Sequence, residues 1–416
     1  MVTWLGYFIL LVLVARYGVH VWLSNLNAAS AQQPLPEVLQ PVYSDLDLRK
    51  ARDYAKARSL FGRIDEAWGL GCLLIFWGLG GWTWLYEFAV SFGWGPLRTG
   101  TVFLLACGAL SWLAGLPTAI VSTFGLEQAF GFNRTTGKIF VADQVKSIVL
   151  GGVLFGALSL LVLWVFAALG DWGWLAAWAV VLGFVLLMQA VAPVWLAPLF
   201  YNFTPLEDGG LRQAVENYAA KVGFPIQGVY EMDGSTRSTS VNAWIGGSGK
   251  FRRIALFDTL MEKLSDSETV AVVAHEVGHW HHRHIRKRLL TMAASMLVFF
   301  GLLGLVLRWS GTYVLMGADP ALAPTAVGIV FFMIVSGPFS ELLSPLTSGV
   351  SRKHEYEADA YAAETADGGA LITALHKLGV ENAANPTPHP LYVKAFYSHP
   401  PLVERLAALS KAVAGK

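Results

Sequence analysis

Long apolar stretches dominate the chain and alternate with polar segments of very different lengths. A membrane-spanning helix needs about 20 largely apolar residues. The first of these stretches lacks the basic start and the small-residue cleavage site of a signal peptide, so we interpret it as a retained helix. The pattern predicts seven transmembrane helices, at 3–23, 67–88, 101–121, 148–169, 174–196, 289–308 and 323–345.

The composition supports a multi-pass integral membrane protein. Of the 416 residues, 55% are hydrophobic and only 14% are charged, whereas a soluble domain carries about 25% charged residues. This excludes soluble globular, disordered and fibrous proteins, and a net charge of +1 argues against a nucleic-acid binder. The two cysteines, Cys72 and Cys107, lie in apolar runs, so we expect buried thiols and no cysteine zinc site.

Lysine and arginine are distributed unevenly among the segments that connect the apolar stretches. The segments 24–66 and 197–288 and the tail after 345 are rich in them, and the intervening connections on the other side are poor. Basic connections stay on the cytosolic side. We therefore expect the N-terminus outside or in a lumen and the C-terminus in the cytosol. The cytosolic side would hold most of the polar mass, in 24–66, 122–147, 197–288 and 346–416.

Two ionisable residues fall inside expected spans. Charged side chains in a membrane either reach an interface or face a polar interior. For Arg16, in the first stretch, the sequence leaves both alternatives open. Glu341, late in the last stretch, either lines a wet cavity or marks an earlier end of that helix.

The segment 197–288 contains the motif with the most specific chemistry. Ser265 and Glu268 form a capping-box pattern, which predicts that a helix begins there. Along that helix follow His275, Glu276 and His279. Residues four apart share one helix face, so the two imidazoles can bind one zinc ion, and Glu276 can act as general base to the attacking water. The alternative is a polar helix with incidental histidines.

Gly278 strengthens the metal interpretation. A glycine inside a helix costs about 1 kcal/mol relative to alanine, so we expect close packing or ligand access at this position. In addition, a polar metal site directly before an apolar span is costly to keep without a use.

A third ligand is expected further along the chain. The segment Ser351–Asp359 should lie on a helix that continues past the last span. Glu355 and Asp359 share a face of it, so Glu355 can bind zinc while Asp359 accepts a hydrogen bond from a ligand histidine. Glu357 lies about 200° round the helix from Glu355 and should point elsewhere. The alternative for this acidic cluster is a solvated helix face.

With these motifs, the sequence resembles the CAAX prenyl protease 1 family, which consists of seven-span zinc metallopeptidases. The resemblance covers most of the chain in ordered blocks. Shorter heat-shock membrane proteases share the zinc motifs but have fewer spans. Besides the zinc motifs, the matching blocks are Phe130–Arg134, Pro193–Phe200, Phe203–Leu206, Ser240–Trp244, Ile254–Leu260 and Ser398–Arg405.

The resemblance implies the same roles for the residues proposed from spacing. His275, His279 and Glu355 would be the ligands of one zinc ion per chain, Glu276 the catalytic base, and Asp359 the partner of a ligand histidine.

The resemblance also implies roles that spacing does not show. Asn242 would lie on an edge strand along which the substrate backbone binds, although it could instead close a turn before Gly246 and Gly247. His399 and Arg405 would stabilise the oxyanion, with structural capping as the alternative for His399. The further histidines His281, His282 and His284, with their basic neighbours, are interpreted as an interfacial belt.

These observations predict an all-α dominated integral membrane protein with seven transmembrane helices. The resemblance implies that these helices enclose a chamber, and that a zincin-like catalytic portion on the cytosolic side contains a small β-strand element. The expected parts are spans one to five in 1–200, the catalytic segment 201–288, spans six and seven in 289–345, and a helical segment 346–416 with the third ligand.

The predicted function is zinc-dependent peptide hydrolysis at the bilayer. By resemblance, the substrate is a prenylated C-terminal tail that loses its aaX tripeptide. A composition rich in alanine, leucine and tryptophan points to a bacterial source and so to an inner-membrane location, with the endoplasmic reticulum expected for a eukaryotic source. Bacteria generally lack protein prenylation, so membrane-protein quality control or peptide processing is the alternative. A seven-span transporter or receptor with structural zinc is the non-enzyme alternative.

Overall fold

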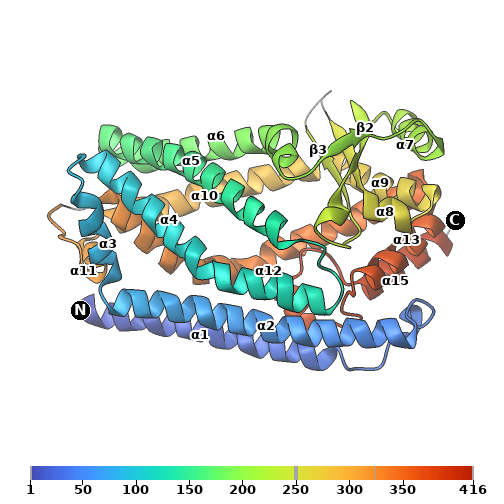
Figure 1. Ribbon diagram of the computed structural model, residues 1–416, viewed down its shortest axis with the longest axis horizontal. Coiled ribbons are helices and arrows are strands. Elements are labelled where there is room, and N and C mark those ends of the chain that lie inside the picture. Colours follow the sequence, from blue (N-terminus) through green and yellow to red (C-terminus); the bar gives the residue numbers. More distant parts are fainter. Residues whose placement is uncertain (1, 248–251, 323, 415–416) are drawn as a thin grey trace.

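The long helices of the protein run side by side along its longest axis (Figure 1). The computed structural model describes residues 2–247, 252–322 and 324–414. The N-terminus lies at one end with α3 (Gly81–Val90) and α11 (Ser310–Leu315) (Figure 1). The C-terminus lies at the other end with the sheet, α7 (Gly210–Lys221), α8 (Asp258–Lys263) and α9 (Asp266–His281). The long helices are α1 (Val2–Ser30), α2 (Asp45–Gly78), α4 (Pro96–Ile120), α5 (Gly137–Leu169), α6 (Gly173–Val191), α10 (His284–Arg308) and α12 (Thr325–Thr365).

The mostly helical architecture confirms the predicted fold class. By length and composition, five helical stretches of the described residues qualify as membrane spans, or six if the bent pair α2–α3 counts as one. One of the five is the 63-residue run Gly137–Leu199, which holds both α5 and α6. The expected spans 148–169 and 174–196 both lie in that run. The count of seven stays a prediction.

The prediction of one continuous helix over 67–88 is wrong, because this stretch contains a break between two helices. α2 ends at Gly78, α3 (Gly81–Val90) follows, and the two meet at an angle of 67°. Gly80 between them has φ +72°, a left-handed conformation that glycine adopts without steric cost. That residue therefore allows the sharp turn.

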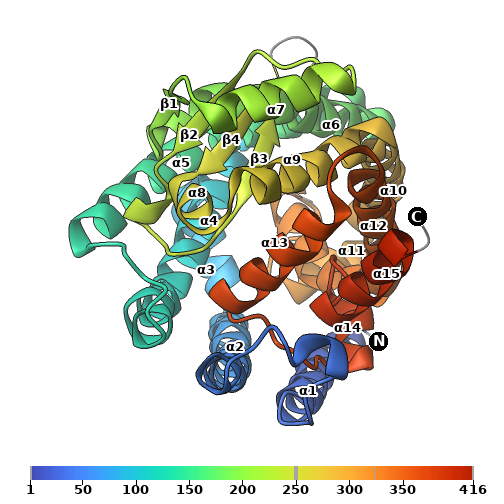
Figure 2. The same cartoon turned by 90° about the vertical axis from the view of Figure 1, so that its right-hand side faces the viewer.

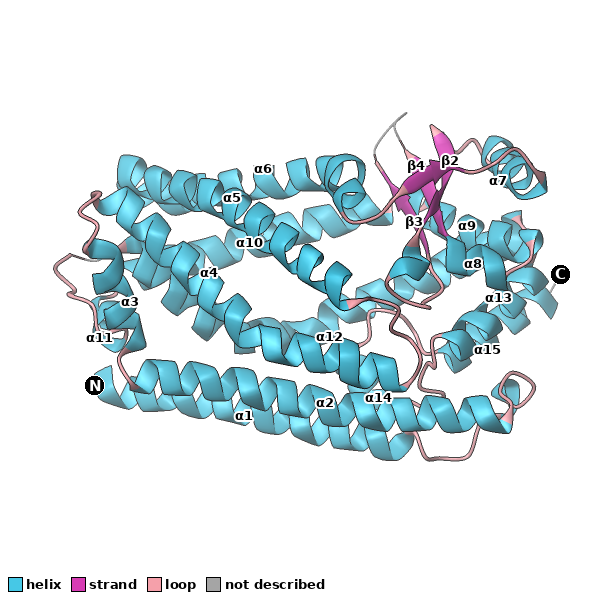
Figure 3. Cartoon of the chain, in the orientation of Figure 1, coloured by secondary structure: helices cyan, strands magenta, loops and turns pink. Residues whose placement is uncertain are grey.

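A four-stranded mixed sheet lies at the end of the molecule that also holds the C-terminus, and it contains every strand of the described residues (Figure 3). Its order is β1-β2-β4-β3, with β2 and β4 parallel and the outer pairs antiparallel. Within the described residues β3 pairs only with β4, so β3 is an edge strand. The strands are β1 (Phe203–Pro205), β2 (Gly228–Met232), β3 (Ala243–Gly246) and β4 (Arg253–Phe257).

The largest buried core lies beneath this sheet. α9 (Asp266–His281) runs through it, and its Val273 and Val277 belong to the same buried cluster as Leu256 of β4 and Leu406 of α15 (Leu402–Ala414). Figure 2 shows α9 between the sheet and α13. The shorter helices here and elsewhere are α7 (Gly210–Lys221), α8 (Asp258–Lys263), α11 (Ser310–Leu315), α13 (Gly368–Glu381), α14 (Pro390–Phe396) and α15 (Leu402–Ala414).

A small ionic cluster joins three of the long helices. Arg16 of α1 pairs with Glu66 of α2 at 3.1 Å and with Glu341 of α12, and His20 contacts the same Glu66. Arg16 therefore finds its partners inside the protein, and Glu341 lies within α12, which continues well beyond it. The sequence had left both points open.

Candidate active site

The helix that carries the two histidines begins where the capping pattern predicts. Ser265 is the N-cap of α9, its hydroxyl accepts a hydrogen bond from the Glu268 N–H, and the Glu268 carboxylate accepts one from the Ser265 N–H at 2.7 Å. Lys377 of α13 donates to the same carboxylate at 2.7 Å. Burial alone would raise the pKa of Glu268, but Lys377 and Ser265 outweigh it and hold that pKa below its ordinary value.

The second half of the candidate site comes from α12. This helix spans 41 residues without interruption, which confirms that the segment Ser351–Asp359 lies on a helix extending past the last expected span. α9 and α12 pack tightly, since a Cβ on Gly278 would lie 2.9 Å from the Ala358 Cα and 3.0 Å from its carbonyl oxygen. Of the two reasons expected for Gly278, close packing or ligand access, the structure shows close packing, and it brings the histidines to the acidic face of α12.

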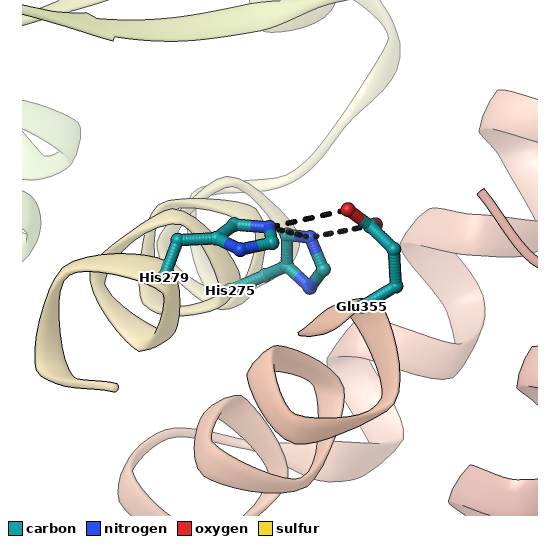
Figure 4. A group of neighbouring side chains, drawn as sticks. All are labelled: His275, His279 and Glu355. Carbon is teal, nitrogen blue, oxygen red and sulfur yellow. Dashed lines mark hydrogen bonds and ion pairs between the residues drawn. The ribbon is translucent and has the colours of Figure 1, made fainter. Parts of the chain in front are cut away.

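His275, His279 and Glu355 converge on one point between the two helices (Figure 4). The two Nε2 atoms are 3.3 Å apart, and each lies 3.4 Å from one oxygen of the Glu355 carboxylate. The Glu355 side chain is only 3% exposed. The three side chains thus form a compact triangle of potential ligands, in which His275 faces Oε2 of Glu355 and His279 faces Oε1.

These distances fit a tetrahedral zinc ion. Zinc binds imidazole nitrogen at about 2.0–2.1 Å, and a tetrahedron of that radius places its corners about 3.3–3.4 Å apart. Glu355 Oε2 is buried and accepts no hydrogen bond from the described residues, which is costly for a carboxylate without a cation. The donor set of two neutral imidazoles and one carboxylate is also that of hydrolytic zinc sites.

Asp359 lies behind His275, as predicted. Its Oδ1 is 2.8 Å from His275 Nδ1, the ring nitrogen that faces away from the triangle. Arg405 binds the same carboxylate in a bidentate manner, with Nε at 2.8 Å from Oδ2 and Nη2 at 2.6 Å from Oδ1. The sequence had placed Arg405 at the oxyanion. That role stays a prediction, and the structure adds the contact with Asp359, which the sequence did not predict.

The other expected residues line one cavity with the triangle. Its volume is about 330 Å³. His399 Nε2 lies 3.5 Å from Glu355 Oε1, and its side chain is mostly exposed. Asn242 stands directly before the edge strand β3, and its side-chain oxygen accepts from the Ala243 N–H at 2.9 Å. Residues lining this cavity include Asn242, Ala243, His275, Glu276, His279, Glu355, His399 and Arg405.

The histidines after the motif depart from the expected belt at one position. His284 is fully buried, so the belt interpretation is wrong for this residue. The reason is the conformation of Arg283, whose φ of +56° is left-handed and separates α9 from α10. α10 therefore begins with His284 turned back toward His279, with the two Nδ1 atoms 2.9 Å apart.

Comparison with known proteins agrees with this geometry. Residues 25–202 match the family described as "CAAX prenyl protease N-terminal, five membrane helices", and residues 205–413 match "Peptidase family M48". CAAX prenyl protease 1 of Saccharomyces cerevisiae is 34% identical over 91% of this chain and 89% of its own length. The chain belongs to the CAAX prenyl protease 1 family. The Arabidopsis thaliana homolog is 33% identical over 95% of both chains.

The fold agrees as closely as the sequence. The crystal structure of Saccharomyces mikatae Ste24p superposes with a TM-score of 0.93 at 30% identity, covering 97% of this chain and 98% of that one. As a CAAX prenyl protease 1 family member, the protein is a multi-pass membrane metalloprotease that acts on protein or peptide substrates. The family predicted from the sequence motifs is confirmed.

Proposed function

We propose that the protein hydrolyses peptides with one zinc ion held by His275, His279 and Glu355. The spacing of the ligand atoms carries this proposal, because the separations of 3.3 Å between the two Nε2 atoms and 3.4 Å from each Nε2 to a Glu355 oxygen suit ligands of one tetrahedral zinc ion. The fourth corner would face the cavity that Glu276 also lines. An open position beside a carboxylate distinguishes a hydrolytic site from a structural one.

Each neighbouring side chain then has a definite task. When bound, zinc supplies Lewis acidity that polarises the scissile carbonyl and lowers the pKa of water. Glu276 takes the proton of the attacking water and passes it to the leaving amine. Asp359 accepts a hydrogen bond from His275 Nδ1–H, which leaves Nε2 as the metal-binding atom.

His399 is our candidate for oxyanion stabilisation. It lies on the cavity side of Glu355, where a donor can reach the developing charge. Arg405 has two of its donors engaged by Asp359, so we assign it to holding that carboxylate in place.

The substrate backbone would bind along β3. Its outer edge carries unpaired backbone groups within the described residues, and Asn242 and Ala243 at its start line the active-site cavity. An extended peptide can add to such an edge with main-chain hydrogen bonds and few side-chain requirements. The relatives are named for CAAX prenyl substrates, and we propose a prenylated C-terminal tail as the substrate, with the catalytic end of the molecule in the cytosol.

The deciding experiment compares purified wild type with Glu276→Gln and with Glu262→Gln, an exposed carboxylate on α8. Each is offered a farnesylated peptide and its unprenylated form, and bound zinc is measured. We expect one zinc per chain in all three proteins, chelator-sensitive cleavage by wild type and Glu262→Gln, and none by Glu276→Gln. Cleavage by Glu276→Gln would contradict the mechanism, and so would the finding that purified wild type contains no zinc. Equal cleavage of both peptides would contradict prenyl specificity.

A further inference from the structure

A second group of polar side chains adjoins the candidate zinc site from behind. His284 is fully buried, and its Nδ1 lies 2.9 Å from Nδ1 of His279. On its other side, His284 Nε2 lies 2.8 Å from Oε2 of Glu357. The His354 ring stacks on the His284 ring, with centroids 3.9 Å apart and planes inclined by 14°. Neither α10 nor Glu357 takes part in the triangle described above.

The distances distinguish this group from a second metal site. Two ligands on one tetrahedral zinc ion stand about 3.3 Å apart, as the atoms of His275, His279 and Glu355 do. The 2.8 Å between His284 Nε2 and Glu357 Oε2 is too short for that arrangement. It is the ordinary length of a charge-assisted N–H···O hydrogen bond.

The metal-facing nitrogen of His279 fixes where the protons lie. His279 turns Nε2 toward His275 and Glu355, so in the neutral ring the proton must be on Nδ1. That Nδ1–H can donate only to an unprotonated Nδ1 of His284, whose own proton is then on Nε2. The Nε2–H donates in turn to Glu357. One set of tautomers therefore gives every ring nitrogen of His279 and His284 a partner.

We infer that His284 and Glu357 are positioning residues, which hold His279 through the hydrogen-bond chain His279–His284–Glu357. Glu357 would do for His279 what Asp359 does for His275, except that the imidazole of His284 lies between the carboxylate and the ligand histidine. A carboxylate behind a ligand histidine fixes its tautomer and raises its basicity, and its loss typically costs 10–100-fold in metal affinity. Glu357 is 31% exposed, so we expect an effect near the lower end of that range.

The test measures zinc affinity, by competition with a chromogenic chelator, in the full-length protein in detergent. Glu357→Gln retains an oxygen that can accept from His284, and we expect zinc to bind about threefold more weakly; Glu357→Ala should weaken it roughly tenfold. Glu364→Gln is the matched control, because Glu364 lies on the same helix and lines the same outer cavity as Glu357. Its affinity should equal that of wild type.

Two further readouts separate positioning from a general loss of structure. The visible absorption of the Co²⁺-substituted protein should change in Glu357→Ala but not in Glu364→Gln, while apo-protein melting temperatures stay alike. If Glu357→Ala bound zinc as tightly as wild type, the inference would be overturned. It would also be overturned if wild type bound two zinc ions per chain and Glu357→Ala bound one, because Glu357 would then be a ligand of a second ion. The inference rests on the proposed zinc site, and wild type that binds no zinc would refute that site itself.

Discussion

Gly278 of α9 lies directly against Ala358 of α12, with no room for a side chain between the two helices. His279 follows Gly278 in the chain and Glu355 precedes Ala358 by three residues, so this contact sets the distance between the candidate ligands. Replacing Gly278 by alanine should push the helices apart by several tenths of an ångström. We expect the ligand triangle to open and the site to weaken.

Gly278→Ala should therefore lower both stability and metal affinity. Overpacking a tight contact costs about 1–3 kcal/mol, which over most of that range exceeds the gain of about 1 kcal/mol in helix propensity. The contact at Gly278 is with backbone atoms of Ala358, which puts the cost in the upper part of the range. Calorimetry with and without zinc, together with peptide cleavage, checks this. Gly62→Ala in α2 is the control, since a Cβ there meets no atom within 4 Å, and it should be neutral or stabilising. A fully active Gly278→Ala would show that the close approach is not required.

Asp359 and Arg405 should act as one unit behind His275. Asp359→Asn should weaken zinc binding at least tenfold, because it removes the carboxylate that fixes the tautomer of the ligand histidine. Arg405→Lys loses the bidentate contact and should have a smaller effect of the same kind. In a double-mutant cycle on zinc affinity, the two effects should be clearly non-additive. Additive effects would indicate that Arg405 works independently, for example at the oxyanion.

The catalytic end should lose stability in acid, because protonation of Glu268 removes a stabilising contribution. Its folded pKa is lowered, so the ionised carboxylate stabilises the fold above the unfolded pKa, and this contribution is lost as the pH falls through the folded value. Thermal unfolding of wild type and Glu268→Gln should differ most at neutral pH and converge at the acid end. Glu262→Gln, at an exposed position, should show no such trend. A constant difference across the pH range would refute the assignment.

The ionic cluster around Arg16 should hold α1 to α2 and α12. Arg16→Leu leaves Glu341 and Glu66 without their cation, and we expect a loss of about 1–3 kcal/mol, measured by unfolding in detergent. Adding Glu341→Leu should recover part of that loss, because it removes one of the unpaired carboxylates. If the double variant is less stable than Arg16→Leu alone, the cost does not come from the unpaired charge.

Local features of the protein followed from the sequence because they depend on residues close together in the chain. The capping box starts α9 at the predicted residue, and the i, i+4 spacing places His275 and His279 on one face. Glu355 and Asp359 share a helix face for the same reason, and Asp359 meets His275 as expected. Apolar length located the long helices, although it did not reveal the break at Gly80.

The tertiary structure decided how these local units meet. That Gly278 packs on Ala358, that Arg405 binds Asp359, and that the ion pairs of Arg16 cross three helices depend on contacts between distant segments. His284 is the clearest case. Its basic sequence neighbours indicated an exposed belt, but the left-handed turn at Arg283 buries it between His279 and Glu357. Periodicity gives the face of a helix on which a side chain lies, and only the packed fold gives what that face touches.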